Sequence, residues 1–376
     1  MKMCFGNGIG FSFEAADPET IFGYSYGSII LEIDEEVEIT GRQFDSILLG
    51  RTIKERSITY GEGRVSLAEL LTLYEGRMEG VYPAVVGSKG GAVSNVEYRA
   101  RSWHTPIYKR AEPKVLIPVF PGTNCEADTA RAVREAGATP EIMIIKDQSA
   151  DDIKRSLEAF ASAMRGTQAL LIPGGNSGYG EPDGSAKLIT AFFRNPEVSE
   201  VTMDLLEKKD GLICGICDGF QALIKLGLLP EGKIMDVDAD HPTLTLNSIG
   251  RHQSRIARVR IASNKSPWLR YNKVGDIYSV PVSHTEGRFI APDEVIRHLA
   301  AVGQIATQYV DNKDNATADI RFNPAGSMMA VEGICSPDGR VFGRMGHAER
   351  TGNGLYKNVP GNYLFGMFEN AVKYFK

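Results

Sequence analysis

The spacing of hydrophobic and polar positions changes near residue 114. From there to residue 226, short apolar runs alternate with stretches in which apolar residues recur every three or four positions. The apolar runs predict buried strands at 115–120, 141–145, 169–172 and 211–214. The periodic stretches predict helices at 126–136, 151–164, within 185–209, and at 219–226. Strands that alternate with helices indicate βαβ units, so we predict an α/β fold with a mostly parallel sheet flanked by helices.

The regions on either side of this segment follow other patterns. Beyond residue 243 the chain is rich in predicted strands, at 255–261, 276–282, 305–310, 329–335 and 341–345, before a last helix at 361–374. In the first hundred residues, 22–38 and 43–50 look like strands, and 65–77 looks like a helix that Ser66 and Glu69 begin as a capping box. We therefore predict three parts: a small α+β segment at 1–100, a basic linker at 101–113, and the main domain at 114–376.

The segment Gly-Ile-Cys-Asp-Gly-Phe-Gln at 215–221 joins a predicted strand to a predicted helix. Glycines two positions before and two positions after Cys217 leave room for a sharp strand-to-helix turn. Such a turn places the sulfur at a helix N-terminus, where the helix dipole and free N–H groups lower the pKa of a thiol. We therefore predict that Cys217 is a nucleophile. The alternative is a small apolar cysteine in an ordinary turn.

Acyl transfer by a cysteine also needs an oxyanion hole, which donates hydrogen bonds to the developing negative charge. The loop LIPGGNSGYG at 171–180 follows a predicted strand, and its adjacent glycines can present backbone N–H groups without obstruction. We assign the N–H groups of Gly175 and Asp218 as the two donors. The alternative for this loop is a flexible surface segment.

Two His-x-Glu pairs are candidates for the base and for the carboxylate that orients it. His284 and Glu286 follow one predicted strand, and His347 and Glu349 follow another. Residues i and i+2 of an extended chain point to the same side, so either carboxylate could orient its imidazole. The spacing alone does not choose between the two pairs.

Composition narrows the setting of this site. The chain has 376 residues, 43% of them hydrophobic and 24% charged, which is ordinary for a soluble globular protein of two domains. The net charge of −5 gives no reason to expect a nucleic acid or an anionic membrane as partner. Five scattered cysteines argue against a disulfide framework and for a cytoplasmic location. Cys214 and Cys217 have CxxC spacing, but no second such pair stands nearby, so we predict no metal site.

Together these motifs resemble a class I, triad-type glutamine amidotransferase domain, which implies a flavodoxin-like fold. The finer motifs FPGTNCE at 120–126, SHTEGR at 283–288 and GHAER at 346–350 are similar to the C-terminal glutaminase domain of phosphoribosylformylglycinamidine synthase. The resemblance implies that Cys217 is the nucleophile and His347 the general base and acid. It also implies that Glu349 orients His347, which decides between the two His-x-Glu pairs.

The same resemblance implies that four further residues, Gln221, Ser283, His284 and Glu286, bind the glutamine substrate. The sequence departs from the family pattern at two positions. Ala348 stands where the family often has proline, and Asn176 where it often has an aromatic residue. Neither change removes a chemical group that the reaction uses.

The resemblance also implies a partner. Residues 1–100 resemble the end of the family's synthetase half, in an aminoimidazole-ribonucleotide-synthetase-like domain, most of which is missing here. ATP and magnesium are expected only in that missing half, and no cofactor is expected in this chain. Ammonia from glutamine would there convert formylglycinamide ribonucleotide to its amidine, in purine biosynthesis, so the isolated chain is expected to be a glutaminase only. The alternatives are another cysteine hydrolase of this fold, such as a peptidase or a deglycase-like protein, and a non-catalytic assembly module.

Overall fold

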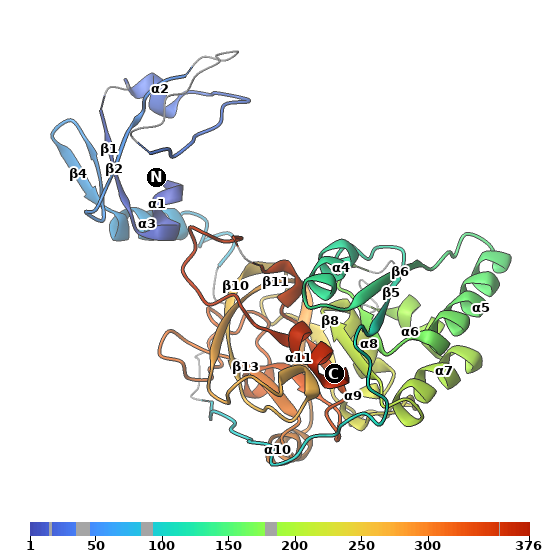
Figure 1. Cartoon of the computed structure of the whole chain (residues 1–376). Coiled ribbons are helices and arrows are strands. Elements are labelled where there is room, and N and C mark those ends of the chain that lie inside the picture. The colour runs from blue at the N-terminus through green and yellow to red at the C-terminus, as the bar shows by residue number, and fades with distance from the viewer. Residues whose placement is uncertain (15–16, 35–45, 84–92, 177–185, 353) are drawn as a thin grey trace. The chain divides into compact units, whose positions relative to one another are not determined.

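The computed structural model describes residues 1–376 except for 15–16, 35–45, 84–92, 177–185 and 353 (Figure 1). The chain forms two compact units, residues 1–84 with 356–360, and residues 85–355 with 361–376. The second unit therefore begins before residue 100, where the sequence suggested a boundary. The assignment of residues 1–100 to the end of a synthetase stays a prediction.

In its described residues, the first unit contains a four-stranded sheet and three short helices. The sheet has the order β2-β1-β3-β4, and its strands are β1 (Gly10–Phe13), β2 (Gly50–Ile53), β3 (Ser57–Tyr60) and β4 (Gly63–Ser66). The helices are α1 (Lys2–Asn7), α2 (Pro18–Phe22) and α3 (Leu67–Gly76). As predicted, Ser66 caps α3, because its side chain accepts the N–H of Glu69 at 3.1 Å. A small α+β unit is thus present.

Two strands predicted in the first unit are placed differently. Residues 23–34 form neither helix nor strand, so the strand predicted at 22–38 is wrong in its described part, and its remainder lies outside the described residues. The side chains of Tyr24 and Ile29 are exposed, and none of the strands that the structure describes pairs with this apolar run. The strand predicted at 43–50 begins only at Gly50, and residues 43–45 lie outside the described residues.

The second unit is built on a nine-stranded sheet with the order β11-β10-β13-β14-β15-β8-β7-β5-β6. Five neighbouring strands run parallel: β15 (Val341–Arg344), β8 (Leu212–Ile216), β7 (Ala169–Ile172), β5 (Lys114–Val119) and β6 (Thr139–Ile144). The other four continue the sheet antiparallel: β14 (Val331–Cys335), β13 (Ile305–Tyr309), β10 (Gln253–Ile261) and β11 (Ile277–His284). The predicted α/β fold is confirmed, with a sheet that is mixed.

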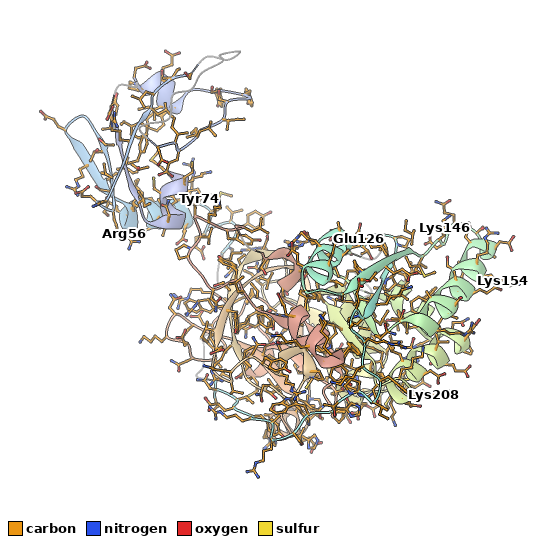
Figure 2. All side chains as sticks on the ribbon, in the orientation of Figure 1. Arg56, Tyr74, Glu126, Lys146, Lys154 and Lys208 are labelled. Atoms are coloured by element: carbon orange, nitrogen blue, oxygen red, sulfur yellow. The ribbon has the colours of Figure 1, made fainter. Side chains whose placement is uncertain are left out.

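Helices flank the parallel half of this sheet. They are α4 (Glu126–Glu135), α5 (Ala150–Gly166), α6 (Lys187–Phe193), α7 (Pro196–Glu207), α8 (Asp218–Lys225) and α11 (Met367–Phe375). Helix α7 contacts both α5 and α6, and α6 contacts α8, whereas α4 contacts α11. Because parallel crossovers are right-handed, these two groups of helices lie on opposite faces of the sheet (Figure 1). Exposed charged side chains such as Lys154 and Lys208 project from the outer surface of α5 and from the end of α7 (Figure 2).

The remaining elements of the second unit were not predicted. They are α9 (Leu228–Glu231), α10 (Asp293–Ala301), the antiparallel pair β9 (Thr243–Leu246) and β12 (Glu286–Ile290), and the one-turn helices η1 (Pro267–Leu269), η2 (Met328–Ala330) and η3 (Ala348–Arg350). Among the residues that the structure describes, no helix has the length and apolar character needed to cross a bilayer.

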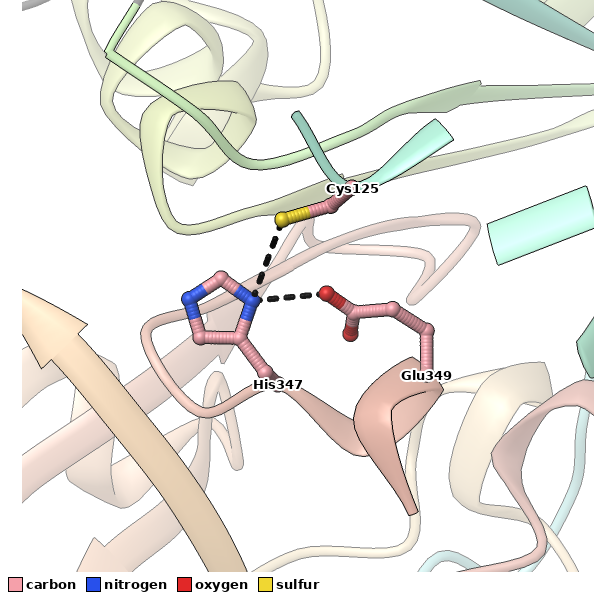
Figure 3. A group of neighbouring side chains, drawn as sticks. All are labelled: Cys125, His347 and Glu349. Carbon is pink, nitrogen blue, oxygen red and sulfur yellow. Dashed lines mark hydrogen bonds and ion pairs between the residues drawn. The ribbon is translucent and has the colours of Figure 1, made fainter. Parts of the chain in front are cut away.

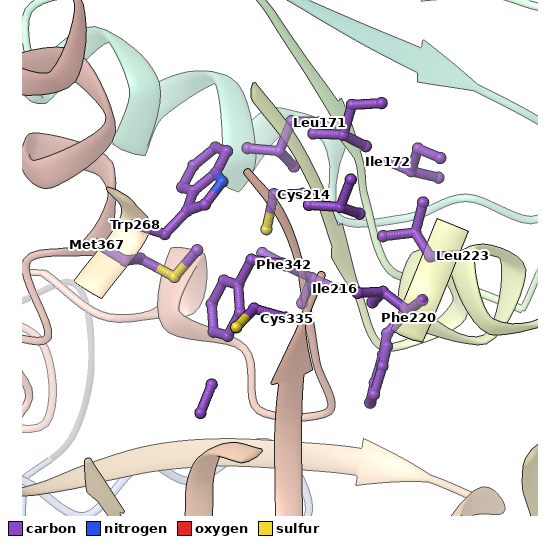
Figure 4. Packing of buried hydrophobic residues seen from close by; sticks show 14 of the residues in the cluster. Leu171, Ile172, Cys214, Ile216, Phe220, Leu223, Trp268, Cys335, Phe342 and Met367 are labelled. Carbon is purple, nitrogen blue, oxygen red and sulfur yellow. The ribbon is translucent and has the colours of Figure 1, made fainter. Parts of the chain in front are cut away.

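The hydrophobic core fixes the strands that carry the site. Every residue of β7 and β8 is buried, which explains why both read as continuous apolar runs in the sequence. Trp268 and Met367 pack on one side of the central strands, and Phe220 and Leu223 of α8 pack on the other (Figure 4). The carboxyl ends of these strands are therefore held on both faces by close packing.

Candidate active site

The carboxyl ends of four neighbouring parallel strands converge on one site. In the order β15, β8, β7 and β5, the segments that follow these strands carry His347, Cys217, Gly174 and Cys125. In open α/β sheets, ligands bind at this edge. The strand order brings together side chains up to 222 positions apart in the sequence, those of Cys125 and His347.

Cys217 forms the predicted sharp turn between β8 and α8. Its backbone has φ 54° and ψ −108°, a conformation that is strained for a residue with a side chain. Its N–H donates to the carbonyl oxygen of Arg344 at 2.8 Å, which anchors the turn to β15. A Cβ on Gly215 would lie 2.5 Å from the carbonyl carbon of Gly219, so glycine is required at 215. The predicted strand-turn-helix geometry is confirmed, and the catalytic role of Cys217 stays a prediction.

The thiol of Cys217 lies in a buried environment, with only 4% of the residue exposed. Burial raises the pKa of this thiol, and the neighbouring charge of Asp218 adds to the increase, whereas the N–H of Asp218 opposes it. The sequence-based expectation of a lowered thiol pKa is therefore wrong here, because lost hydration outweighs the helix N-terminus. A thiolate at Cys217 thus needs a proton acceptor close by.

His347 and Glu349 form the imidazole–carboxylate pair that the sequence suggested. Nδ1 of His347 lies 2.6 Å from Oε1 of Glu349, and both side chains are buried (Figure 3). The carboxylate accepts the hydrogen on Nδ1, which leaves Nε2 with a lone pair. Within the described residues, Nε2 of His347 has no hydrogen-bond partner. The pair therefore presents a basic nitrogen, Nε2 of His347, that can accept a proton.

Gly174 brings the nucleophile and the imidazole together. A Cβ on Gly174 would lie 2.7 Å from Cε1 of His347 and 3.2 Å from Cβ of Cys217. The same atom would lie 3.3 Å from Sγ of Cys125. Only glycine leaves room for these three side chains around one backbone position. Cys217 and His347 are therefore neighbours across Gly174.

The predicted oxyanion donors belong to the loop after β7 and to the start of α8. Gly175 forms an antiparallel bridge with Thr123, and its two hydrogen bonds, of 3.3 and 2.9 Å, use the residues before and after Gly175. The N–H of Gly175 itself therefore points away from Thr123 and β5, toward the β8 side of the loop. The N–H of Asp218 lies at the start of α8 and interacts with the Cys217 sulfur. This geometry suits two donors, and their role in catalysis stays a prediction.

Of the predicted glutamine-binding residues, Gln221 belongs to the elbow helix, and Ser283 and Glu286 contact the elbow or that helix. Nε2 of Gln221 donates to the carbonyl oxygen of Glu286 at 2.5 Å, which links α8 to β12. Sγ of Cys217 lies 3.8 Å from the carbonyl oxygen of Ser283. The structure thus places the carbonyl oxygen of Ser283 beside the nucleophile and that of Glu286 against the elbow helix, and glutamine binding by these residues stays a prediction.

His284, the fourth of these residues, is bonded differently from His347. Its Nδ1 lies 3.0 Å from Oδ1 of Asn247, and its Nε2 makes no hydrogen bond within the described residues. Burial lowers the pKa of His284 to about 3, so its imidazole is neutral at physiological pH. His284 and Glu286 therefore do not form a second imidazole–carboxylate pair, and geometry favours His347 as the base.

Cys125 and Arg350 belong to the site but were not among the predicted site residues. Sγ of Cys125 lies 3.7 Å from Nδ1 of His347 (Figure 3). The same sulfur lies 2.9 Å from Nη2 of Arg350. Burial raises the pKa of Cys125 to about 12. Potential metal ligands of Cys125, His347 and Glu349 lie within 4.8 Å of one another, but a cation would have to displace the guanidinium of Arg350. The FPGTNCE motif, which contains Cys125, was the signal available in the sequence.

Comparison with known proteins identifies the class of this site. Residues 112–375 match the family model described as a CobB/CobQ-like glutamine amidotransferase domain. The solved structure of PurLQS from Thermotoga maritima resembles the chain with a TM-score of 0.50 and 23% identity, over 70% of this chain and 100% of that one, which is a likeness of fold. The chain belongs to the CobB/CobQ-like glutamine amidotransferase family.

Curated relatives narrow the family further. The chain is 34% identical over 257 residues to the phosphoribosylformylglycinamidine synthase subunit PurQ of Chlorobaculum tepidum, covering 68% of this chain and 95% of the relative. It is 33% identical over 275 residues to the subunit of the same name from Archaeoglobus fulgidus, covering 70% and 98%. Within the amidotransferases, this chain is therefore a member of the PurQ family, as the sequence motifs predicted.

Proposed function

We propose that this chain is the glutaminase of a phosphoribosylformylglycinamidine synthase and hydrolyses glutamine to glutamate and ammonia through a thioester at Cys217. The observation that carries the proposal is the meeting of the Cys217 elbow with the His347–Glu349 pair around Gly174. Membership of the PurQ family supports the same reaction.

The reaction begins with transfer of the Cys217 proton to Nε2 of His347. Because burial raises the pKa of the isolated thiol, the thiolate forms together with the imidazolium as a coupled pair. Glu349, whose Oε1 is 2.6 Å from Nδ1, stabilises the positive charge that His347 acquires. The buried setting strengthens both interactions, since little water screens them.

The thiolate then attacks the side-chain carboxamide carbon of glutamine. The carbonyl oxygen becomes an oxyanion, which the N–H groups of Gly175 and Asp218 stabilise. His347 returns its proton to the departing nitrogen, so that ammonia leaves and a γ-glutamyl thioester remains on Cys217. Water, deprotonated by His347, hydrolyses this thioester to glutamate and regenerates the thiol.

The residues that pack around the elbow would bind the substrate. Gln221 and Glu286 are linked by a hydrogen bond, and Ser283 contacts the nucleophile through its carbonyl oxygen. The neutral imidazole of His284 lies beside them and contributes polar contacts rather than proton transfer. These four residues would bind the amino-acid part of glutamine and orient its carboxamide toward Cys217.

The partner of this chain would be the synthetase half of the enzyme. That half would bind ATP and magnesium and would use the ammonia to convert formylglycinamide ribonucleotide to formylglycinamidine ribonucleotide, a step of purine biosynthesis. No cofactor is required by the chemistry of the Cys217 site. The five scattered cysteines support a cytoplasmic location.

The alternatives are not favoured. A peptidase or deglycase-like hydrolase would share the cysteine elbow, but the whole of residues 112–375 matches an amidotransferase family. A non-catalytic module would have no need for a buried His347–Glu349 pair beside the strained cysteine.

The test replaces Cys217 with alanine and measures glutamate release from glutamine. We expect Cys217→Ala to abolish release, because no thioester can form. Cys335→Ala, which removes another buried free thiol from β14, should retain activity. A glutamine-mimicking diazo-ketone should label the wild-type chain at Cys217. Glutamate release that survives Cys217→Ala would overturn the proposal.

A further inference from the structure

A buried ion pair lies directly beneath the proposed catalytic residues. Glu332 is in β14 and Arg344 ends β15, the neighbouring antiparallel strand, and both side chains are fully buried. Nε and Nη2 of Arg344 both lie 3.0 Å from the same carboxylate oxygen, Oε1 of Glu332. The other oxygen, Oε2, accepts a short hydrogen bond from the hydroxyl of Thr307.

Glu332 also holds the two residues that precede His347. Its carboxylate Oε1 accepts the N–H of Gly346 at 2.7 Å, and its backbone carbonyl accepts the N–H of Met345 at 3.0 Å. A Cβ on Gly346 would lie 2.6 Å from that same Oε1, so only glycine lets the backbone come this close. The path of the chain into His347 is therefore set by Glu332 together with the carbonyl oxygen of Pro281, which accepts the N–H of His347 at 2.9 Å.

The same pair is joined to the nucleophile. The carbonyl oxygen of Arg344 accepts the N–H of Cys217 at 2.8 Å, at the end of the parallel pairing of β15 with β8. The guanidinium of Arg344 is itself fixed, because it lies 4.0 Å from the centre of the Phe365 ring. One rigid unit thus supports the backbone of both Cys217 and His347.

Stability alone does not explain a charged pair at this position. Removing a carboxylate and a guanidinium from water is costly, and apolar residues of similar volume often stabilise a fold equally well. An apolar side chain at 332, however, could not accept the N–H of Gly346. Glu332 therefore has two roles: its charge offsets that of Arg344, and its acceptor oxygen holds the N–H of Gly346.

We propose that Glu332 is a positioning residue for glutamine hydrolysis, acting through its hydrogen bond to Gly346 to place the His347 imidazole against Cys217. Arg344 holds the accepting oxygen in place. This inference rests on the proposed function, because it assigns to Glu332 the placement of the base in that reaction.

The test compares Glu332→Gln with Glu332→Asp. Glutamine keeps the length of the side chain and an acceptor oxygen but loses the charge, whereas aspartate keeps the charge and withdraws the oxygen by one methylene. We expect Glu332→Gln to stay near the wild-type kcat. Glu332→Asp should lower kcat by about 10- to 100-fold, the effect of misplacing a catalytic group by about 1 Å, with KM for glutamine unchanged.

A matched control separates positioning from stability. Gln304→Asn also shortens a buried polar side chain by one methylene. The side chain of Gln304 donates to the carbonyl oxygens of Pro230 and of Cys335, the residue that ends β14 away from His347. It should lower the thermal unfolding midpoint but leave kcat unchanged. Amide hydrogen exchange gives a readout besides activity: the N–H of Gly346 should exchange faster in Glu332→Asp and stay protected in Glu332→Gln.

Three results would overturn the inference: a wild-type kcat in Glu332→Asp, equal losses of kcat in Glu332→Asp and Gln304→Asn, or a larger loss in Glu332→Gln than in Glu332→Asp. If Glu332→Asp does not fold, Thr307→Val can be tested instead, because it removes the hydrogen bond to the other carboxylate oxygen of Glu332. It should lower kcat and reduce the protection of the Gly346 N–H from hydrogen exchange. Unchanged protection there would count against the inference. A wild-type chain that neither releases glutamate nor is labelled at Cys217 would instead refute the proposed function, and the exchange of Gly346 would still test the hydrogen bond.

Discussion

Replacing Gly174 with alanine would place a methyl group between the proposed base and nucleophile. The new carbon would lie 2.7 Å from Cε1 of His347, whereas carbon atoms in contact are about 3.5 to 4.0 Å apart. It would also lie 3.2 Å from Cβ of Cys217 and 3.3 Å from Sγ of Cys125, so the methyl group is confined on three sides. The imidazole must therefore move by about 0.8 Å or more to relieve the clash.

The size of the effect follows from this displacement. A shift of about 1 Å in a catalytic group costs about 100-fold in rate, so we expect kcat of Gly174→Ala to fall by about that factor. Overpacking of a buried site costs about 1–3 kcal/mol, so the variant should still fold. KM for glutamine should change little, because the three atoms nearest to the added methyl group belong to His347, Cys217 and Cys125 and not to the predicted glutamine-binding residues.

The assay measures glutamate release, labelling of Cys217 by a glutamine-mimicking diazo-ketone, and thermal unfolding. Gly166→Ala is the matched control, because a Cβ on Gly166, the last residue of α5, would meet nothing within 4 Å. It should leave kcat unchanged and stabilise the fold by up to about 1 kcal/mol. Equal kcat values for Gly174→Ala and Gly166→Ala would refute the argument that His347 and Cys217 meet at Gly174.

Two further predictions concern the histidines. His347→Ala should lower kcat by about 100- to 10,000-fold, the usual contribution of a general base, whereas His284→Ala should mainly raise KM for glutamine; the reverse order in steady-state kinetics would exchange their roles. His284 also predicts a pH dependence of stability: its pKa of about 3 in the folded chain lies below the ordinary 6.5, so at pH values between these the unfolded chain binds a proton that the folded chain does not. The free energy of unfolding, measured in urea, should therefore fall as the pH drops below 6.5. His284→Gln should lose less of this free energy than the wild-type chain, by up to about 1.4 kcal/mol per pH unit. Identical pH profiles of the two chains would contradict this assignment.

Much of the fold could be predicted because its signals are local. The strand β7 begins and ends where the apolar run 169–172 does. A strand that is buried on both faces is apolar along its whole length, so the apolar run marks both of its ends. Helix α5 follows its apolar period and begins after Ser149, whose side chain accepts the N–H of Asp152. The elbow at Cys217 was predictable for the same reason, because the required glycines lie within two residues of it.

The parts that could not be predicted depend on residues far apart in the chain. The contact of Cys125 with His347 spans 222 positions, and the contact of Arg344 with Cys217 exists only because β15 pairs with β8. The raised pKa of Cys217 depends on burial, which no pattern around the cysteine reveals. The apolar run at 22–38 misled the prediction because a strand needs a neighbour, and residues 23–34 pair with none of the described strands.

The position of β15 in the sheet bears on how the thiol becomes reactive during synthesis. This strand follows all the others in the sequence of the described residues, yet it lies in the middle of the nine-stranded sheet, between β14 and β8. A nascent chain that has already made the Cys217 elbow still lacks β15 and the imidazole that follows it. The nine-stranded sheet can close only after β15 has left the ribosome, and we expect a product that ends before His347 to release no glutamate from glutamine.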